Sequence, residues 1–129
     1  MQTFRAILFC LMSWAILAQG NPVRSGSGDG TYYAPGLGAC GKWNSGSDMI
    51  MAASREVFDT FPGATANPNK NPICGREVTA TYQGKTIKVK VVDRCAGCKW
   101  GDIDLSPTAF SKLAPLSVGR LKGVRWSMN

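Results

Sequence analysis

Apolar and polar residues alternate from Glu77 to Tyr82 and again from Thr86 to Val91. This period of two is typical of β-strands with one buried face and is incompatible with an amphipathic helix. A Gln-Gly pair at 83–84 divides the run, and the glycine supplies the positive φ that a tight hairpin turn needs. The segment therefore predicts a β-hairpin whose apolar face is formed by Val78, Ala80, Tyr82, Ile87, Val89 and Val91.

Further short elements surround this hairpin in a chain of 129 residues, which is long enough for one domain. We expect strands at 31–33, 49–53, 103–105 and 121–128. Two helices are expected to begin after capping serines, the first running from Ser54 to Phe61 and the second from Ser106 to Leu113. With 15 glycines and 7 prolines for turns, these elements predict a mainly β fold, a small barrel of about six strands with two short helices.

The first 20 residues resemble a secretory signal peptide. Arg5 precedes an apolar run from Ala6 to Ala18, and small residues follow it at the expected cleavage site. We therefore expect a secreted, extracellular protein. The Gly- and Ser-rich segment 21–29 predicts a flexible lead-in, which places the folded domain at 30–129.

Five cysteines occur, and removal of the signal peptide would take Cys10 and leave four. In an oxidising compartment four cysteines predict two disulfides, for which three pairings are possible. A four-thiolate zinc site would need two close pairs, whereas Cys40 and Cys74 each stand alone. The Cys95–Cys98 pair resembles a redox motif, but it lies between strands and is more typical of a structural disulfide. We expect no metal and no cofactor.

The chain contains no histidine, which excludes Ser-His-Asp and Cys-His catalysis and the usual histidine-containing zinc sites. Residues 36–41 match a glycine-rich dinucleotide fingerprint, but no βαβ unit surrounds them. The net charge is +7, with the basic residues scattered along the chain. Such a positive charge favours an anionic partner, for example an acidic polysaccharide. The alternative is that the basic residues form a solvated surface without a specific partner. We expect a monomer without a nucleic-acid or membrane partner.

Two carboxylates are candidates for chemistry. Asp104 lies between Ile103 and Leu105 in a short strand, where an acid is costly unless it faces a cleft or is hydrogen-bonded. Asp93 ends an apolar strand, and it either faces the same cleft or accepts hydrogen bonds from turn amides. Glycoside hydrolysis would require two such acids facing each other across the sugar.

Aromatic residues fall into two groups. Three are candidates for stacking on sugar rings: Tyr32, Tyr33 and Trp100. Five others are expected in the core, as is usual for large aromatic side chains: Trp43, Phe58, Phe61, Phe110 and Trp126.

Five ordered motifs carry a family resemblance: Gly30-Thr31-Tyr32-Tyr33, Gly38-Ala39-Cys40-Gly41, Asn71-Pro72-Ile73-Cys74-Gly75, the run Val91–Cys98 and the run Asp102–Phe110. Over residues 28–128 the chain closely resembles the single-domain expansin-like proteins of fungi. These include the loosenins and belong with rare-lipoprotein-A-like and barwin-like domains. The resemblance implies a six-stranded double-psi β-barrel with a shallow polysaccharide groove. It also implies a Cys40–Cys74 disulfide and a Cys95–Cys98 disulfide.

The resemblance extends to individual residues. Asp104 matches the acid that expansins need for wall loosening and that related endoglucanases use as general acid. Thr31 and Asp93 match other polar residues of the groove. The first-strand Asp that serves as base in those endoglucanases is replaced by a Tyr-Tyr-Ala segment, and Asp102 stands where expansins have His.

These matches imply binding of cellulose-, chitin- or pectin-type wall polysaccharide and its loosening without hydrolysis. The groove would use Asp104 as the functional acid, with substrate contacts from Thr31, Tyr32, Tyr33, Asp93, Trp100 and Asp102. Two alternatives stay open: inhibition of a cysteine protease, as in some secreted single-barrel relatives, and weak glycoside hydrolysis.

Overall fold

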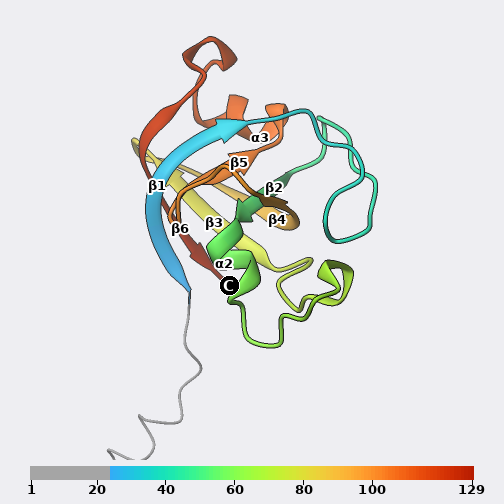
Figure 1. Ribbon diagram of the computed structural model, residues 1–129. Coiled ribbons are helices and arrows are strands. Elements are labelled where there is room, and N and C mark those ends of the chain that lie inside the picture. The colour runs from blue at the N-terminus through green and yellow to red at the C-terminus, as the bar shows by residue number, and fades with distance from the viewer. Residues whose placement is uncertain (1–23) are drawn as a thin grey trace, which may run out of the picture.

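The computed structural model describes residues 24–129, so the expected signal peptide lies outside the described residues. Six strands form a closed barrel in the order β1-β5-β2-β4-β3-β6 (Figure 1). Their bounds are β1 (Ser25–Tyr32), β2 (Ile50–Ser54), β3 (Glu77–Tyr82), β4 (Lys85–Cys95), β5 (Ile103–Leu105) and β6 (Leu121–Met128). The small, mainly β barrel expected from the sequence is confirmed.

Two of the strand pairs are parallel, β1 with β5 and β2 with β4, and the other four are antiparallel. Both parallel pairs join strands that are far apart in the chain. They bring the carboxyl ends of β1 and β5 together, because parallel strands end at the same edge of a sheet.

Strands β3 and β4 form the expected hairpin, paired from Glu77↔Lys90 to Tyr82↔Lys85. Gly84 adopts the positive φ that the sequence predicts, at 80°, and Gln83 does so as well, at 47°. Two consecutive positive φ values are typical of the two-residue turns that match the twist of the flanking strands. On the inner face Val78, Ala80, Ile87, Val89 and Val91 are buried, and Tyr82 packs partly against them.

Serine caps begin both helices, α2 (Arg55–Asp59) and α3 (Pro107–Leu113). The hydroxyl oxygens of Ser54 and Ser106 each accept a hydrogen bond at 3.2 Å from the backbone amide three residues on. Helix α2 ends at Asp59, two residues earlier than expected. Two short 3-10 turns follow in the loops, η1 (Pro68–Lys70) and η2 (Leu116–Val118). Within residues 24–129 no helix is long and apolar enough to cross a membrane.

The lead-in is shorter than the sequence suggests, because β1 begins at Ser25. Residues 25–28 pair with β6 from Ser127 back to Val124. A Cβ on Gly26 would lie 2.6 Å from the ring of Trp100 and 2.9 Å from that of Trp126. The glycine that suggested flexibility therefore lets two indole rings pack directly against the strand.

The core contains most of the expected aromatic residues. Phe58, Phe110 and Trp126 are buried, and Phe61 packs partly against them. The prediction for Trp43 is wrong, since this side chain is 77% exposed. It lies in a loop outside the barrel, where it forms an isolated bridge with Leu37.

Two disulfides form with the pairing that the resemblance implies. Cys40–Cys74 joins two loops that are 34 residues apart in the chain, and Cys95–Cys98 closes a tight turn at the end of β4.

Candidate functional site

Both candidate carboxylates belong to one row of residues across four neighbouring strands, which we call the Asp93–Asp104 row. Thr31 of β1 is paired with Asp104 of β5, Asp104 with Ala52 of β2, and Ala52 with Asp93 of β4. Because neighbouring strands lie about 4.8 Å apart, the backbones of the two acids are separated by roughly 10 Å. Strand pairing thus places two acids that are 11 residues apart in the sequence on the two strands that flank β2.

Asp104 is partly buried and is held by Thr31. The Thr31 hydroxyl donates a hydrogen bond of 2.9 Å to Asp104 Oδ1. Burial raises the pKa of the Asp104 carboxyl, the Thr31 bond opposes that rise, and the negative charge of Asp93 adds to it. Asp104 therefore keeps a proton to higher pH than a solvated aspartate, and it can donate or accept a hydrogen bond on this face.

Asp93 accepts hydrogen bonds from backbone amides, which is one of the two roles that the sequence left open for it. Its Oδ1 accepts hydrogen bonds of 2.8 Å from the backbone amides of Ala39 and Arg94. These bonds anchor the loop that carries Ala39 onto the end of β4. One oxygen of Asp93 is thus engaged by the protein itself.

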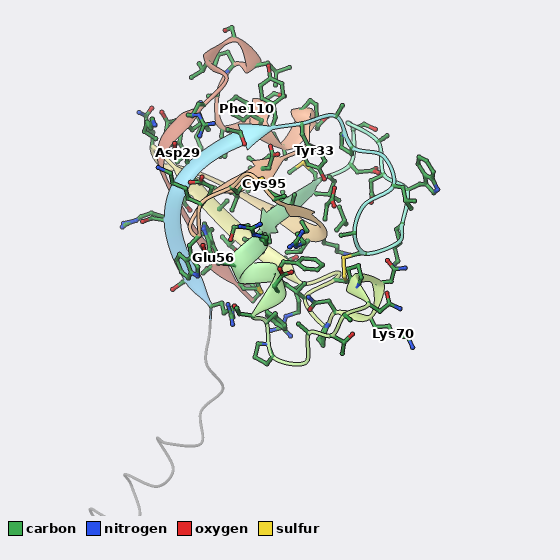
Figure 2. The ribbon with its side chains drawn as sticks, in the orientation of Figure 1. Asp29, Tyr33, Glu56, Lys70, Cys95 and Phe110 are labelled. Atoms are coloured by element: carbon green, nitrogen blue, oxygen red, sulfur yellow. A yellow bond between two sulfur atoms is a disulfide. The ribbon has the colours of Figure 1, made fainter. Side chains whose placement is uncertain are left out.

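Tyr33, labelled in Figure 2, directly follows β1 and is half-buried, and the charges of both acids act on its hydroxyl. Burial raises the pKa of its hydroxyl far above the usual value, and the charges of Asp93 and Asp104 and a hydrogen bond to Asp93 raise it further. Its backbone amide donates to the Leu105 carbonyl at 3.0 Å, which fixes the residue over β5. Tyr33 presents a neutral hydroxyl to this face over the whole physiological pH range.

A pocket of about 640 Å³, the Asp104 pocket, opens at the β1 end of the row. Asp104 lies against the Cys95–Cys98 disulfide there, with the two sulfur atoms and a carboxylate oxygen all within 4.8 Å of one another. The cysteines are bonded to each other, so they offer no thiolate to a metal. The pocket is lined by Asp29, Thr31, Tyr32, Cys95, Gly97, Cys98, Lys99, Asp102, Asp104, Gly119, Arg120 and Lys122.

The basic residues that line this pocket were not predicted from the sequence. Arg120 Nη1 and Lys122 Nζ both bind Asp29 Oδ2, at 3.0 and 2.9 Å, and these bonds lower the pKa of Asp29. The charge of Arg120 also acts against the raised pKa of Asp104. In the sequence these two cations are part of a scattered basic composition, and no local motif marks them.

The remaining predicted contact residues fall in different places. Tyr32 lines the Asp104 pocket, with its hydroxyl donating to the Leu116 carbonyl at 3.1 Å. Asp102 lines it too, but both its oxygens accept backbone amide bonds, from Asp29 at 2.8 Å and Lys99 at 2.9 Å. Trp100 lines a separate pocket beside residues 25–27 of β1. Strand pairing therefore unites the predicted set except for Trp100.

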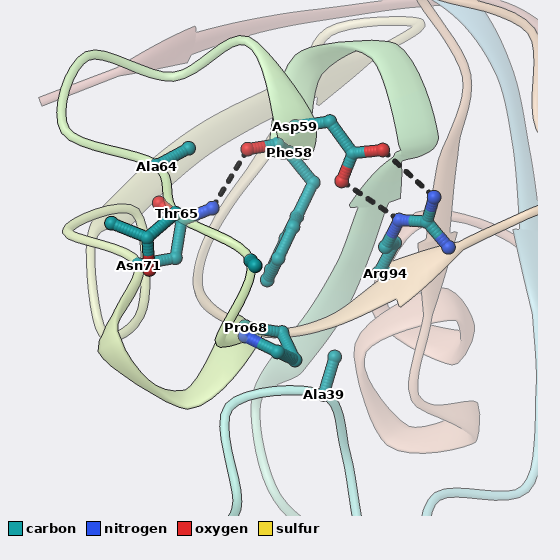
Figure 3. Close-up of a pocket in the computed structure, with 9 residues that line it drawn as sticks. Ala39, Phe58, Asp59, Ala64, Thr65, Pro68, Asn71 and Arg94 are labelled. Atoms are coloured by element: carbon teal, nitrogen blue, oxygen red, sulfur yellow. Dashed lines mark hydrogen bonds and ion pairs between the residues drawn. The ribbon is translucent and has the colours of Figure 1, made fainter.

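Beside the Asp93 end of the row lies another pocket, of about 650 Å³ (Figure 3). Asp59 and Arg94 line it and form a bidentate ion pair, in which Arg94 Nε and Nη2 donate to the two Asp59 carboxylate oxygens at 2.9 and 2.7 Å. Ala39, whose amide binds Asp93, lines the same pocket. The row thus extends between two hollows on the surface.

Comparison with known proteins identifies the family. Residues 26–125 match a double-psi β-barrel family model described as lytic transglycolase. The papain inhibitor of Streptomyces mobaraensis is 42% identical over 102 residues, which cover 78% of this chain and 68% of that protein. The solved structure of a Streptomyces papain inhibitor superposes with a TM-score of 0.74 at 38% identity, over 84% of this chain and 98% of that chain.

An expansin mutant from Clavibacter michiganensis, solved in complex with cellohexaose, shares the fold. Its TM-score is 0.66 at 23% identity, over 82% of this chain and half of the expansin. The closed barrel, the disulfide pairs and these matches agree with one another. The chain belongs to the family of expansin-like double-psi β-barrel proteins.

Proposed function

We propose that this protein is secreted, binds cell-wall polysaccharide through the Asp93–Asp104 row and the Asp104 pocket, and loosens it without hydrolysis. The observation that carries the proposal is the row itself, with two carboxylates and a threonine beside a pocket, together with the neutral hydroxyl of Tyr33 next to the acids. A related expansin binds cellohexaose, which supports a β-linked glycan as the ligand class.

Loosening would proceed by exchange of hydrogen bonds. Asp104, when ionised, accepts a bond from a sugar hydroxyl that is stronger than the neutral bonds between glycan chains. Tyr33 can exchange its hydrogen bond to Asp93 for one to a ring or hydroxyl oxygen of the sugar, since its proton stays in place. A glycan chain held in this way exchanges contacts with its neighbours for contacts with the protein, and no covalent bond changes.

Hydrolysis would need more than this row offers. A water molecule would have to be activated by a second carboxylate across the sugar, and one oxygen of Asp93 already accepts two amide bonds. Reducing-sugar release is therefore expected to stay at the background level of the glycan alone.

The test is a pull-down on cellulose, chitin and pectin at low and high salt, with reducing sugar measured in parallel. Asp104→Asn is expected to weaken salt-resistant binding by about tenfold, equivalent to one charge-assisted hydrogen bond. Glu56→Gln is the control, because Glu56 is an exposed acid on α2, outside the row. Equal binding by both variants would refute the proposal, and sugar release that disappears in Asp104→Asn would replace it with hydrolysis.

A second candidate function, inhibition of a papain-type cysteine protease, is favoured by a different part of the surface. Leu37 and Trp43, which face each other across a bridge, are 59% and 77% exposed. The loop between them is anchored by the Cys40–Cys74 disulfide and by the amide of Ala39 on Asp93. A rigid loop flanked at its base by two exposed apolar side chains suits docking at a protease cleft, because little conformational entropy is lost on binding. A papain inhibitor is among the relatives.

The two candidates are separable by one pair of variants. Trp43→Ala is expected to raise the inhibition constant for papain at least tenfold while leaving polysaccharide binding unchanged. Asp104→Asn is expected to do the reverse. Absence of papain inhibition at high molar excess of the unaltered protein would eliminate this second function.

A further inference from the structure

We propose that the pocket around Trp100 is a second glycan-binding surface, separate from the Asp104 pocket, which stacks an indole ring on the face of a pyranose. The ligand class rests on the proposed polysaccharide function, whereas the location rests on the contacts below. The pocket measures about 520 Å³ and is lined by Ser25, Gly26, Ser27, Trp100, Arg125 and Trp126.

The exposed ring of this surface is held in place from below. Trp100 is 43% exposed, and its ring centroid lies 5.9 Å from that of the buried Trp126 at an interplanar angle of 36°. Gly26 leaves room for both rings against β1. The Trp100 carbonyl accepts a 2.8 Å bond from Ser54, and Trp126 donates a 2.9 Å bond to the Gly101 carbonyl. A ring already fixed in this way loses little rotamer freedom when it stacks on a ligand.

Polar residues line the same pocket as the ring. Register pairs Ser27 of β1 with Arg125 of β6, and Ser25 with Ser127. Ser25, Ser27 and Arg125 are exposed, and among residues 24–129 Arg125 forms no ion pair. Hydroxyl and guanidinium donors beside an apolar ring match a pyranose, which carries an apolar C–H face and a rim of hydroxyls.

The chain itself separates this surface from the Asp104 pocket. At Gly28 the segment that contains Gly101 crosses β1 so closely that a Cβ on Gly28 would lie 2.4 Å from the Gly101 backbone. Residues 25–27 of β1 line the Trp100 pocket on one side of this crossing, and Asp29 and Thr31 line the Asp104 pocket on the other. One protein molecule can therefore contact two glycan segments at once, and simultaneous contact multiplies the two affinities through a high effective concentration.

Titration of the purified protein with cellohexaose and with chitohexaose, followed by calorimetry and by intrinsic tryptophan fluorescence, tests this proposal. The unaltered protein is expected to bind two oligosaccharides and Trp100→Ala one, with binding to the insoluble polymer about tenfold weaker. The matched control is Trp43→Ala, which removes a more exposed tryptophan in another loop. This variant is expected to leave the number of bound oligosaccharides and the affinity for the polymer unchanged.

Arg125→Ala provides a second variant that does not disturb the indole packing, with about threefold weaker binding expected and Lys85→Ala as its control. The inference would be overturned if Trp100→Ala and Arg125→Ala bound glycans with the same stoichiometry and affinity as their controls. This holds even if Asp104→Asn weakens binding as proposed. Loss of binding in Trp100→Ala combined with no effect of Asp104→Asn would support the inference and refute the proposed role of the row. A protein that binds none of the glycans would overturn both.

Discussion

Replacing Thr31 with valine removes one hydroxyl and keeps the side-chain shape. Thr31 supplies the side-chain hydrogen bond that Asp104 receives, at 2.9 Å, and that bond counteracts the effect of burial on the Asp104 pKa. The variant therefore tests whether a partly buried carboxylate of this site depends on its neighbour on β1.

The sign of the pH effect follows from the direction of the pKa shift. The folded protein holds the Asp104 proton above the usual pKa of 3.8, so stability falls as pH rises from that value through the folded-state pKa. Thr31→Val raises the folded-state pKa further and makes the fall larger. We expect a loss of about 1.5 kcal/mol at pH 8, where the bond is to a carboxylate, and about 0.5 kcal/mol at pH 3, where both partners are neutral.

Urea unfolding followed by tryptophan fluorescence measures both values, and Asp104→Asn completes a double-mutant cycle. With Asn at position 104 the Thr31→Val loss should be about 0.5 kcal/mol at either pH. Equal losses at pH 3 and pH 8 in the unaltered background would refute the reasoning, since the bond would then not distinguish the charged from the neutral acid.

Further substitutions test other contacts. Ser54→Ala removes both the cap on the Val57 amide and the bond to the Trp100 carbonyl, and an unfolding free energy lower by about 2 kcal/mol is expected in urea; a loss below about 0.5 kcal/mol would contradict it. Replacing Cys40 and Cys74 together opens a loop of 34 residues and should cost about 4 kcal/mol, whereas replacing the Cys95–Cys98 pair should cost about 2 kcal/mol. Calorimetry that finds the reverse order would show that loop entropy does not govern these two bonds.

The sequence predicted the local features of the fold well, because their causes are local. The alternation from Glu77 to Val91 specifies a hairpin through side-chain period alone. Ser54 and Ser106 mark helix starts because a capping hydroxyl acts within three residues. Asp104 was identifiable as unusual since its two apolar neighbours fix the face it occupies.

Features that depend on distant pairing were less accessible. Arg120 and Lys122 approach the Asp104 pocket only because β6 pairs with β1, and nothing in their local sequence indicates that partner. Trp43 was predicted to be a core residue because tryptophan side chains are usually buried. It lies instead in a loop outside the barrel, with its side chain exposed. Trp100 was predicted beside the acids, but its ring packs against Gly26 at the start of β1, and the close crossing at Gly28 separates its pocket from theirs.

The order of strands around the barrel has a consequence for how the chain folds. Gly30 of β1 pairs with Ile103 of β5 and with Leu121 of β6, so both neighbours of the first strand come from the last third of the chain. Such distant pairings require large loops to close before any contact is gained, and proteins dominated by them fold in about milliseconds to seconds. During synthesis β1 therefore emerges before either of its neighbours, one edge stays unpaired until β5 has been synthesised, and the other stays unpaired until β6 has been synthesised. During that interval the glycines and serines of residues 25–28 lower the risk of aggregation. A strand that begins without apolar side chains offers other chains little surface on which to aggregate.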